Sequence, residues 1–308
     1  SVIILFVGFG LLAALVFAFR FFVRRFSTDN SYFNHQIFLI RLPKEKPQDE
    51  NKETSLQQMR EEIAKGETIF ASIGGLKAQR GFASWLLGRN DHFSFEIVAS
   101  ANKIAFYAAA PRHLSRYLEQ QVTAHYPEAV IEEVEDYNVF GINSKISAAC
   151  LQTRKHFALP LRTYQKIEVD PLNSLINIMS KLDKNESMAV QYVVRSAYGS
   201  WHRRVRSIVR RIQEKNSVRE GIGAGGIAEV FASLGDILSA GVKSDSKNPN
   251  NTAVKRLSAV EEETLKSIEE KNLRAGLDVN LRIIVSGASK ERADAYLENV
   301  VSVFTEYN

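Results

Sequence analysis

Two short stretches near the middle of the chain, at 93–97 and at 104–108, alternate between hydrophobic and polar residues. Alternation of this kind on either side of a two-residue break predicts a β-hairpin with one buried face. Pro111 then opens a segment in which apolar residues recur at helical spacing as far as Tyr126. Residues 129–134 again have the pattern of a strand. The predicted order is therefore strand, strand, helix, strand.

This order is most of a ferredoxin-like α/β sandwich, which needs only one earlier strand and one earlier helix. Residues 68–74 have a strand-like pattern, and residues 77–87 have the pattern of a short helix. We therefore predict a first ferredoxin-like unit over 67–140. Residues 36–41 predict a further short strand and residues 55–64 an amphipathic helix, both in the segment before this unit.

The pattern returns when the sequence is shifted by about 180 residues. The pair Lys-Ile at 103–104 then aligns with Arg-Ile at 282–283. The motif Tyr-Leu-Glu-x-x-Val at 117–122 aligns with the same motif at 296–301, and no gap is needed between these anchors. Self-similarity of this kind indicates an internal repeat. We predict a second ferredoxin-like unit over 141–308, which lacks the last strand of the first.

The second unit carries a long insertion at 198–275, after a predicted helix at 170–182 and a predicted strand at 188–195. Residues 201–215 have the pattern of a helix with one apolar face and cationic residues around the rest. Residues 257–271 predict a helix that returns to the sheet. The insertion is thus expected to project as an antiparallel helical pair with a flexible tip.

The cationic helix is the candidate binding surface of the chain. Its functional interpretations are contact with the phosphates of nucleic acid or with anionic lipid headgroups. The alternative is a solvated face whose cations pair with acidic residues of the returning helix, such as those at 261–263 or 269–270. The residues predicted to contact a partner or a phosphate are Trp201, Arg203, Arg204, Arg206, Arg210, Arg211 and Lys215.

Residues 1–19 carry no charge, and Arg20, Arg24 and Arg25 follow, interleaved with aromatic and aliphatic residues. At about 1.5 Å per residue, a helix of this length spans a hydrocarbon core of about 30 Å. Basic residues after an apolar span favour a cytoplasmic location for the chain that follows them. The pattern predicts a transmembrane helix with its basic flank over 1–26, and a buried core helix is the alternative.

This prediction places the protein in the cell membrane, with a single pass in this segment and the bulk of the chain in the cytoplasm. A juxtamembrane linker and helix then occupy 27–66, including a charged linker at 43–53 that is too polar to pack. The chain starts with Ser rather than Met, so further residues upstream are expected.

The composition adds few constraints. The net charge of +5 is mild and selects no partner, while the single cysteine, Cys150, excludes an intramolecular disulfide and suits a reducing compartment. Gly221, Gly223 and Gly226 formally match a dinucleotide-binding pattern. That pattern requires a preceding strand, whereas a cationic helix precedes them here, so a hinge or a partner-docking segment is favoured.

The sequence contains no P-loop, no zinc-ligand spacing and no nucleophile-elbow motif. The acidic run at 132–136 is interpreted as a solvated strand edge. We therefore predict no catalytic, cofactor-binding or metal-binding residues, and no enzyme activity for this segment.

Three runs of sequence, at 95–140, 170–205 and 281–304, share diffuse features with a known family. The residues that carry the likeness are Tyr126, Pro127, Asp170, Pro171, Leu172, Glu186, Gln191 and Trp201. Together the runs resemble the N-terminal membrane-anchored region of ATPases of the type IV secretion and conjugative DNA-transfer class. In that class an ATPase core of the HerA/FtsK-like DNA-pump superfamily follows this region, whereas the present chain stops before any nucleotide-binding motif.

These patterns predict an α+β protein with an N-terminal transmembrane helix and two ferredoxin-like α/β sandwich units, the second with a long helical insertion. The resemblance implies a non-catalytic region that anchors and assembles a DNA-transfer ATPase. The implied partners are membrane lipid, secretion-channel proteins or its own ATPase domain, further copies in a homo-oligomer, and DNA. The alternative is a free-standing, membrane-tethered nucleic-acid-binding or adapter protein, whose nucleic-acid binding would fall steeply with salt.

Overall fold

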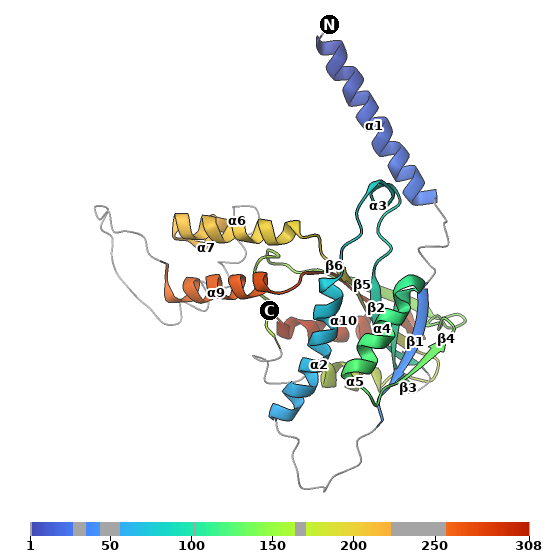
Figure 1. Cartoon of the computed structure of the whole chain (residues 1–308). Coiled ribbons are helices and arrows are strands. Elements are labelled where there is room, and N and C mark those ends of the chain that lie inside the picture. Colours follow the sequence, from blue (N-terminus) through green and yellow to red (C-terminus); the bar gives the residue numbers. More distant parts are fainter. Residues whose placement is uncertain are drawn as a thin grey trace.

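The computed structural model of the chain describes residues 2–26, 35–43, 56–100, 103–163, 171–222 and 257–307. These residues form a mixed α+β fold built on one seven-stranded antiparallel sheet. Several helices pack on the sheet, a pair of helices projects to one side of it, and the N-terminal helix points away from it (Figure 1). The α+β class predicted from the sequence is confirmed.

The helices and strands fall into two halves of the sheet and a set of additional helices. The first half contains β1 (His35–Arg41), α2 (Leu56–Gly75), β2 (Phe93–Ser100), β3 (Lys103–Pro111), α4 (Arg112–His125) and β4 (Val130–Val134). The second half contains β5 (Lys145–Leu151), α5 (Pro171–Met179), β6 (Ser187–Ser196), β7 (Leu277–Gly287), α10 (Lys290–Val303) and the 3-10 helix η1 (Phe304–Tyr307). The additional helices are α1 (Val2–Phe26), α3 (Phe82–Leu86), α6 (Ser200–Lys215), α7 (Val218–Ile222) and α9 (Ala259–Leu273).

The strands lie in the order β4-β1-β3-β2-β6-β7-β5, and every neighbouring pair is antiparallel. β2 and β3 form the hairpin that the alternation predicted. β2 also pairs with β6 along its whole length, from Phe93 opposite Val194 to Ser100 opposite Ser187. This pairing joins the two halves into one continuous sheet.

One face of the sheet is covered by α2, α4, α5 and α10. In the first half, Phe93 of β2 is buried with Ile73 of α2 and Leu118 of α4. In the second half, Ile97 of β2 is buried with Met179 of α5 and with residues of α10. Phe93 and Ile97 are an even number of residues apart on one strand, so both clusters lie on the same face of the sheet.

The opposite face is covered in part by the segment that leads from β4 to β5. Tyr137 of this segment stacks on Tyr107 of β3, with 4.7 Å between ring centroids, and Val139 packs against Val98 of β2. The Tyr137 hydroxyl donates a hydrogen bond to the Glu96 carboxylate on β2. Burial and the neighbouring Glu96 raise the pKa of Tyr137, so its hydroxyl remains protonated and keeps this hydrogen bond.

The prediction that residues 68–74 form the first strand is wrong, because they belong to helix α2. Ile69 and Ile73 lie one helical turn apart and are both buried against the sheet, so the apolar residues form a helix stripe. The strand that completes this half is β1, which the prediction left in the segment 27–66. β1 lies between β4 and β3, so the first half begins at β1 and not at residue 67.

Most other predicted elements are present. The helix predicted at 77–87 is reduced to the short α3, which follows Gly81 with its positive φ of 113°. The strands predicted at 129–134 and 188–195 are confirmed as β4 and β6, and the helices at 170–182 and 257–271 as α5 and α9. The predicted charged linker, from residue 44 onward, and the predicted flexible tip at 223–256 lie outside the described residues.

α1 is the helix predicted at the N-terminus, and it contacts α3 at the end nearer the sheet (Figure 1). Over the part of the chain that the structure describes, no helix combines the length and the apolarity needed to cross a membrane. The helix itself is confirmed, and its crossing of a membrane stays a prediction.

Candidate functional site

Helix α6 is the cationic helix predicted in the insertion, and it follows β6 after a short turn that ends at Gly199. Val205, Ile208 and Ile212 recur at helical spacing and are buried. They pack in one cluster with Ile268 of α9. α6 and α9 lie side by side (Figure 1), as the predicted helical pair requires. The buried face of α6 is therefore directed toward α9, and its opposite face toward solvent.

The solvent face of α6 carries six cationic side chains and one carboxylate. Arg210 pairs with Glu214 of the same helix, with 2.7 Å between Nε and Oε1, and the Arg204 guanidinium lies 5.4 Å from the centre of the Phe157 ring. No other ion pair reaches this face from the residues that the structure describes. The exposed cations are Arg203, Arg204, Arg206, Arg210, Arg211 and Lys215.

Two acidic residues of α9, Glu261 and Glu269, are bound to groups other than the arginines of α6. The Glu261 carboxylate accepts hydrogen bonds from the backbone N–H of Ser258, at 3.1 Å, and from that of Val218, at 3.2 Å. The first of these belongs to a capping box that begins α9. Glu269 lies 3.5 Å from the uncharged side-chain amide of Gln213. Within the described residues, these two acids neutralise none of the arginines of α6.

Trp201 differs from the other predicted contact residues because it is half-buried at the base of α6. Its indole lies against Gly276, just before β7, and a Cβ atom at that glycine would collide with the ring. The neighbouring His202 places Nδ1 3.0 Å from the backbone carbonyl oxygen of Asn272 in α9. Trp201 and His202 therefore hold the base of the helix pair together, which is a structural role that the cationic pattern did not reveal.

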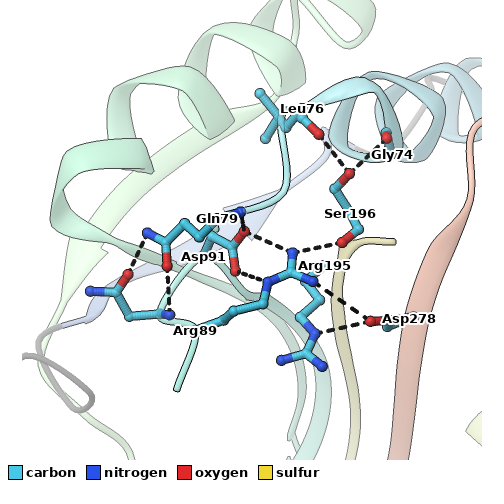
Figure 2. A network of polar contacts seen from close by, with 9 residues as sticks. Gly74, Leu76, Gln79, Arg89, Asp91, Arg195, Ser196 and Asp278 are labelled. Atoms are coloured by element: carbon cyan, nitrogen blue, oxygen red, sulfur yellow. Dashed lines mark hydrogen bonds and ion pairs between the residues drawn. The ribbon is translucent and has the colours of Figure 1, made fainter. Parts of the chain in front are cut away.

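A buried ionic network lies at the ends of β6 and β7 from which this helix pair leaves the sheet (Figure 2). The Arg89 guanidinium, in the turn before β2, donates to the Asp91 carboxylate through Nε at 2.9 Å and Nη2 at 2.8 Å. Its Nη2 also donates to the backbone carbonyl oxygen of Ser196 at the end of β6, at 2.6 Å. Its Nη1 lies 3.7 Å from the Asp278 carboxylate on β7. Three strands are therefore tied together where α6 leaves the sheet.

The same network reaches the end of α2. The Ser196 hydroxyl lies 2.9 Å from the backbone carbonyl oxygen of Gly74 and 2.6 Å from that of Leu76. The backbone N–H of Gln79 donates a hydrogen bond to the Asp91 carboxylate at 3.0 Å. Burial disfavours the charged form of Asp91, but the hydrogen bonds from Arg89 and Gln79 lower the pKa of Asp91 below its usual value. Although burial also opposes the charge on Arg89, Asp91 raises the pKa of Arg89. The pair is therefore ionised at neutral pH. Its further partners, Ser196 and Asp278, lie more than a hundred residues away along the chain, so local spacing could not predict the network.

The glycine pattern at 221–226 lies partly outside the described residues. Gly221, in α7, approaches Ile212 of α6 so closely that a Cβ atom at this position would collide with it. Helix packing therefore accounts for Gly221, while Gly223 and Gly226 lie beyond the described range. The described residues contain no group of three or more His, Cys, Asp or Glu side chains that could hold a metal ion.

A second surface surrounds α1. The exposed apolar side chains of this helix include Phe9, Leu11, Leu15, Phe17 and Phe21. Near its end, the Arg20 guanidinium lies 4.5 Å from the centre of the Trp85 ring of α3. Phe82 stacks beside Trp85 and is 73% exposed. The side chains of Arg24 and Arg25, the other residues of the predicted basic flank, are outside those that the structure describes.

The chain belongs to a family that is described as Domain of unknown function (DUF8128), whose model matches residues 46–308. Comparison with curated proteins found no match, and comparison with solved structures found none either.

Proposed function

We propose that this chain is the membrane-anchoring and assembly region of a DNA-transfer ATPase of the type IV secretion and conjugation class, and that it catalyses no reaction itself. The observation that carries the membrane part is α1, which projects away from the sheet (Figure 1) and whose large apolar side chains are exposed. Large exposed apolar surfaces mark interaction sites, and aliphatic and aromatic side chains fit the acyl chains of lipid. The ATPase part of the proposal rests on the resemblance of the sequence to the N-terminal membrane-anchored region of ATPases of that class.

The contacts at the end of α1 support a lipid interface there. Trp85 and Phe82 of α3 are aromatic, at least partly exposed, and adjacent to Arg20. Aromatic rings and arginines are typical of the headgroup region, where one end of a side chain meets hydrocarbon and the other meets water. α3 would then lie in this region beside the end of α1.

The orientation of α6 supports contact with the same membrane surface. α6 lies on the α1 side of α9 (Figure 1), and its buried face is directed toward α9. Its cationic face is therefore directed to the side of the molecule from which α1 projects. Anionic headgroups attract cations near the surface by about 1 kcal/mol each. We assign the cationic face of α6 to these lipid phosphates.

The proposal includes a finer architecture. The element order β1-α2-β2-β3-α4-β4, with the strands arranged β4-β1-β3-β2, supports a ferredoxin-like unit. The order β5-α5-β6-β7-α10 supports a second unit, for which the described residues provide no fourth strand. Such a rigid platform would hold α1 and α6 in a defined arrangement while partner proteins assemble on it.

Vesicle flotation of the full chain tests the membrane assignment. The wild type is expected to float with neutral vesicles through α1, and to bind vesicles rich in anionic lipid more tightly. Replacing Arg203, Arg204, Arg210 and Arg211 with Gln should lower the preference for anionic vesicles on the order of a hundred-fold or more, because four cations are lost. A matched variant with Gln at four exposed cations outside α6, Arg112, Arg116, Lys181 and Lys184, should keep most of the preference.

Two results would contradict the assignment. A wild type that fails to float with either kind of vesicle would remove the membrane role of α1. A quadruple α6 variant that keeps its anionic preference but loses salt-dependent binding to duplex DNA would assign α6 to nucleic acid, as the adapter alternative requires. The ATPase part is tested by the intact mass of the native polypeptide from its own membrane, which should be well above 34.6 kDa.

A further inference from the structure

The two halves of the sheet share one order of elements, but the described residues of the second half lack the last strand of that order. The order β5-α5-β6-β7-α10 repeats the order β1-α2-β2-β3-α4. At one end of the sheet β4 pairs with β1, whereas no described strand pairs with the outer side of β5 at the other end. The repeated motifs agree with this correspondence, because the 103–104 pair lies on β3 and the 282–283 pair on β7. The two Tyr-Leu-Glu-x-x-Val motifs lie on α4 and α10.

Equivalent apolar residues are buried to different degrees in the two halves. Leu118 and Val122 of α4 are 1% and 4% exposed, and Ile131 of β4 packs against the same cluster. Their counterparts on α10, Leu297 and Val301, are only partly buried. Among the described residues, these two side chains of α10 are therefore less fully covered than their counterparts on α4, where the fourth strand contributes to the cover.

The outer edge of β5 has the chemistry of a strand-binding edge. An unpaired edge presents backbone N–H and C=O groups to an incoming strand. Ile146, Ala148 and Cys150 are exposed along one face of β5. Lys145 is exposed on the strand itself. The Nζ atom of Lys290 lies 3.2 Å from the backbone carbonyl oxygen of Ile146 and 2.9 Å from the Asp294 carboxylate of its own helix. The edge thus combines a strand that no described strand covers on its outer side with the exposed charge of Lys145 and the paired charge of Lys290.

We infer that the outer edge of β5 binds an extended polypeptide segment as an eighth strand, antiparallel to β5, in which aliphatic side chains and carboxylates are mixed as they are in β4. The sequence of β4 is Val-Ile-Glu-Glu-Val. In the eighth strand, the aliphatic side chains cover Leu297 and Val301, and the carboxylates meet Lys145 and Lys290. This mode of recognition takes its affinity from main-chain hydrogen bonds and its specificity from alternate side chains. The inference rests on the two-unit architecture proposed above and not on the membrane association.

Cys150 provides a direct test, because it is the only cysteine of the chain and lies exposed on β5. Peptides with the sequence of residues 127–135, each with one activated cysteine at a successive position, are incubated with the full chain. The mixed disulfide with Cys150 is then measured by intact mass. Opposite residues of an antiparallel pair have Cα atoms about 4.5–5.5 Å apart, a distance that a disulfide spans. We expect labelling at alternate positions to exceed that at intervening positions at least ten-fold, with one maximum.

Two controls separate strand addition from simple thiol reactivity. A peptide with Pro at its centre should label at least ten-fold less, because it lacks a backbone donor and resists the strand conformation. Leu297→Asp should lower the labelling by a similar factor, whereas Val130→Asp, on the edge strand at the opposite end of the sheet, should leave it unchanged. Val130 is 51% exposed, and circular dichroism checks that both variants fold.

Uniform labelling, or none, would overturn the inference. A disulfide between two copies through Cys150 without any peptide adduct would assign the edge to a second copy and would also overturn the proposed occupant. None of these variants alters α1 or α6, so vesicle flotation of the same proteins is expected to be unchanged. The strand inference can therefore fail while the membrane proposal stands, and the reverse is also true.

Discussion

The two halves of the sheet share an order of elements but differ at the connection between their second and third strands. In the first half, β2 and β3 are joined by residues 101–102 alone, whereas in the second half β6 and β7 are joined by residues 197–276. β6 and β7 nevertheless pair over ten residues, from Ser187 opposite Ser286 to Ser196 opposite Leu277. A long insertion at a hairpin tip is tolerated when the paired strands fix both of its ends, because loop-closure entropy grows only slowly with length.

The halves also differ in how they fix a carboxylate just before the second strand. Asp91 precedes β2 and pairs with Arg89, whose side chain is 3% exposed. Glu186 precedes β6 and is itself fully buried, but its partner Arg292, on α10, is 46% exposed. Nε and Nη2 of Arg292 lie 2.7 and 2.8 Å from the two carboxylate oxygens. The first pair therefore buries both charges, and the second buries only one.

The largest expected effect comes from breaking the fully buried pair. Asp91→Ala leaves the Arg89 guanidinium buried without its partner, which should cost about 3–5 kcal/mol of unfolding free energy. Glu186→Ala should cost less, about 2 kcal/mol, since Arg292 is half exposed and can be hydrated once its partner is gone. Denaturant unfolding followed by circular dichroism measures both. Asp278→Ala, at a carboxylate that is 47% exposed, is the control and should cost less than about 1 kcal/mol. Equal losses of unfolding free energy for Asp91→Ala and Glu186→Ala would contradict the difference drawn between the two ion pairs.

A smaller effect should distinguish the two equivalent helices. Leu118→Ala removes a side chain that is 1% exposed and should cost about 3 kcal/mol. Leu297→Ala removes a partly buried side chain and should cost about 1 kcal/mol. The same unfolding measurement in the presence of a β4-type peptide sharpens the test, because an added strand should raise the cost of Leu297→Ala and leave that of Leu118→Ala unchanged. Equal costs without peptide would show that α10 needs no further cover.

The smallest effect is a dependence of stability on pH that originates in the first half. Burial, together with the neighbouring His35 and Arg195, lowers the pKa of His92 to about 4, and the imidazole rings of His35 and His92 lie 4.4 Å apart. Since an unfolded histidine titrates near 6.5, the unfolded chain binds a proton between pH 6.5 and pH 4 that the folded chain does not. Stability should therefore fall as the pH is lowered through this window.

His92→Gln should make this slope shallower by less than about 1 kcal/mol per pH unit, allowing for the partial exposure of the ring. The measurement is the unfolding free energy at pH 4.5, 5.5 and 6.5 at constant ionic strength. An unchanged slope in the variant would show that His92 is not the source. Below about pH 4, protonation of Asp91 and Glu186 should destabilise wild type and variant alike, because the pKa values of both carboxyls are lowered in the folded chain.

Periodic patterns in the sequence were enough to predict the β2–β3 hairpin, the two helices of the insertion and the cationic face of α6. These elements depend on spacing along one segment, such as the recurrence of Val205, Ile208 and Ile212 on the buried face of α6. The same reasoning misassigned residues 68–74, because Ile69, Phe70 and Ile73 suit a buried strand as well as a helix stripe. A short apolar run does not distinguish the two structures until the surface against which it packs is known.

Contacts between distant segments decided the rest. Only the pairing with β3 and β4 makes β1 an interior strand of the sheet, because strand neighbours are chosen by long-range hydrogen bonding rather than by local propensity. The pairing of Arg89 and Asp91 is local, but its burial depends on Ser196 and Asp278, more than a hundred residues away. Trp201 likewise became a structural residue because Gly276 leaves room for its ring. Local spacing thus indicates most of the helices and strands, whereas the identity of a short apolar run, the positions of the elements and the burial of their polar side chains depend on which distant segments meet.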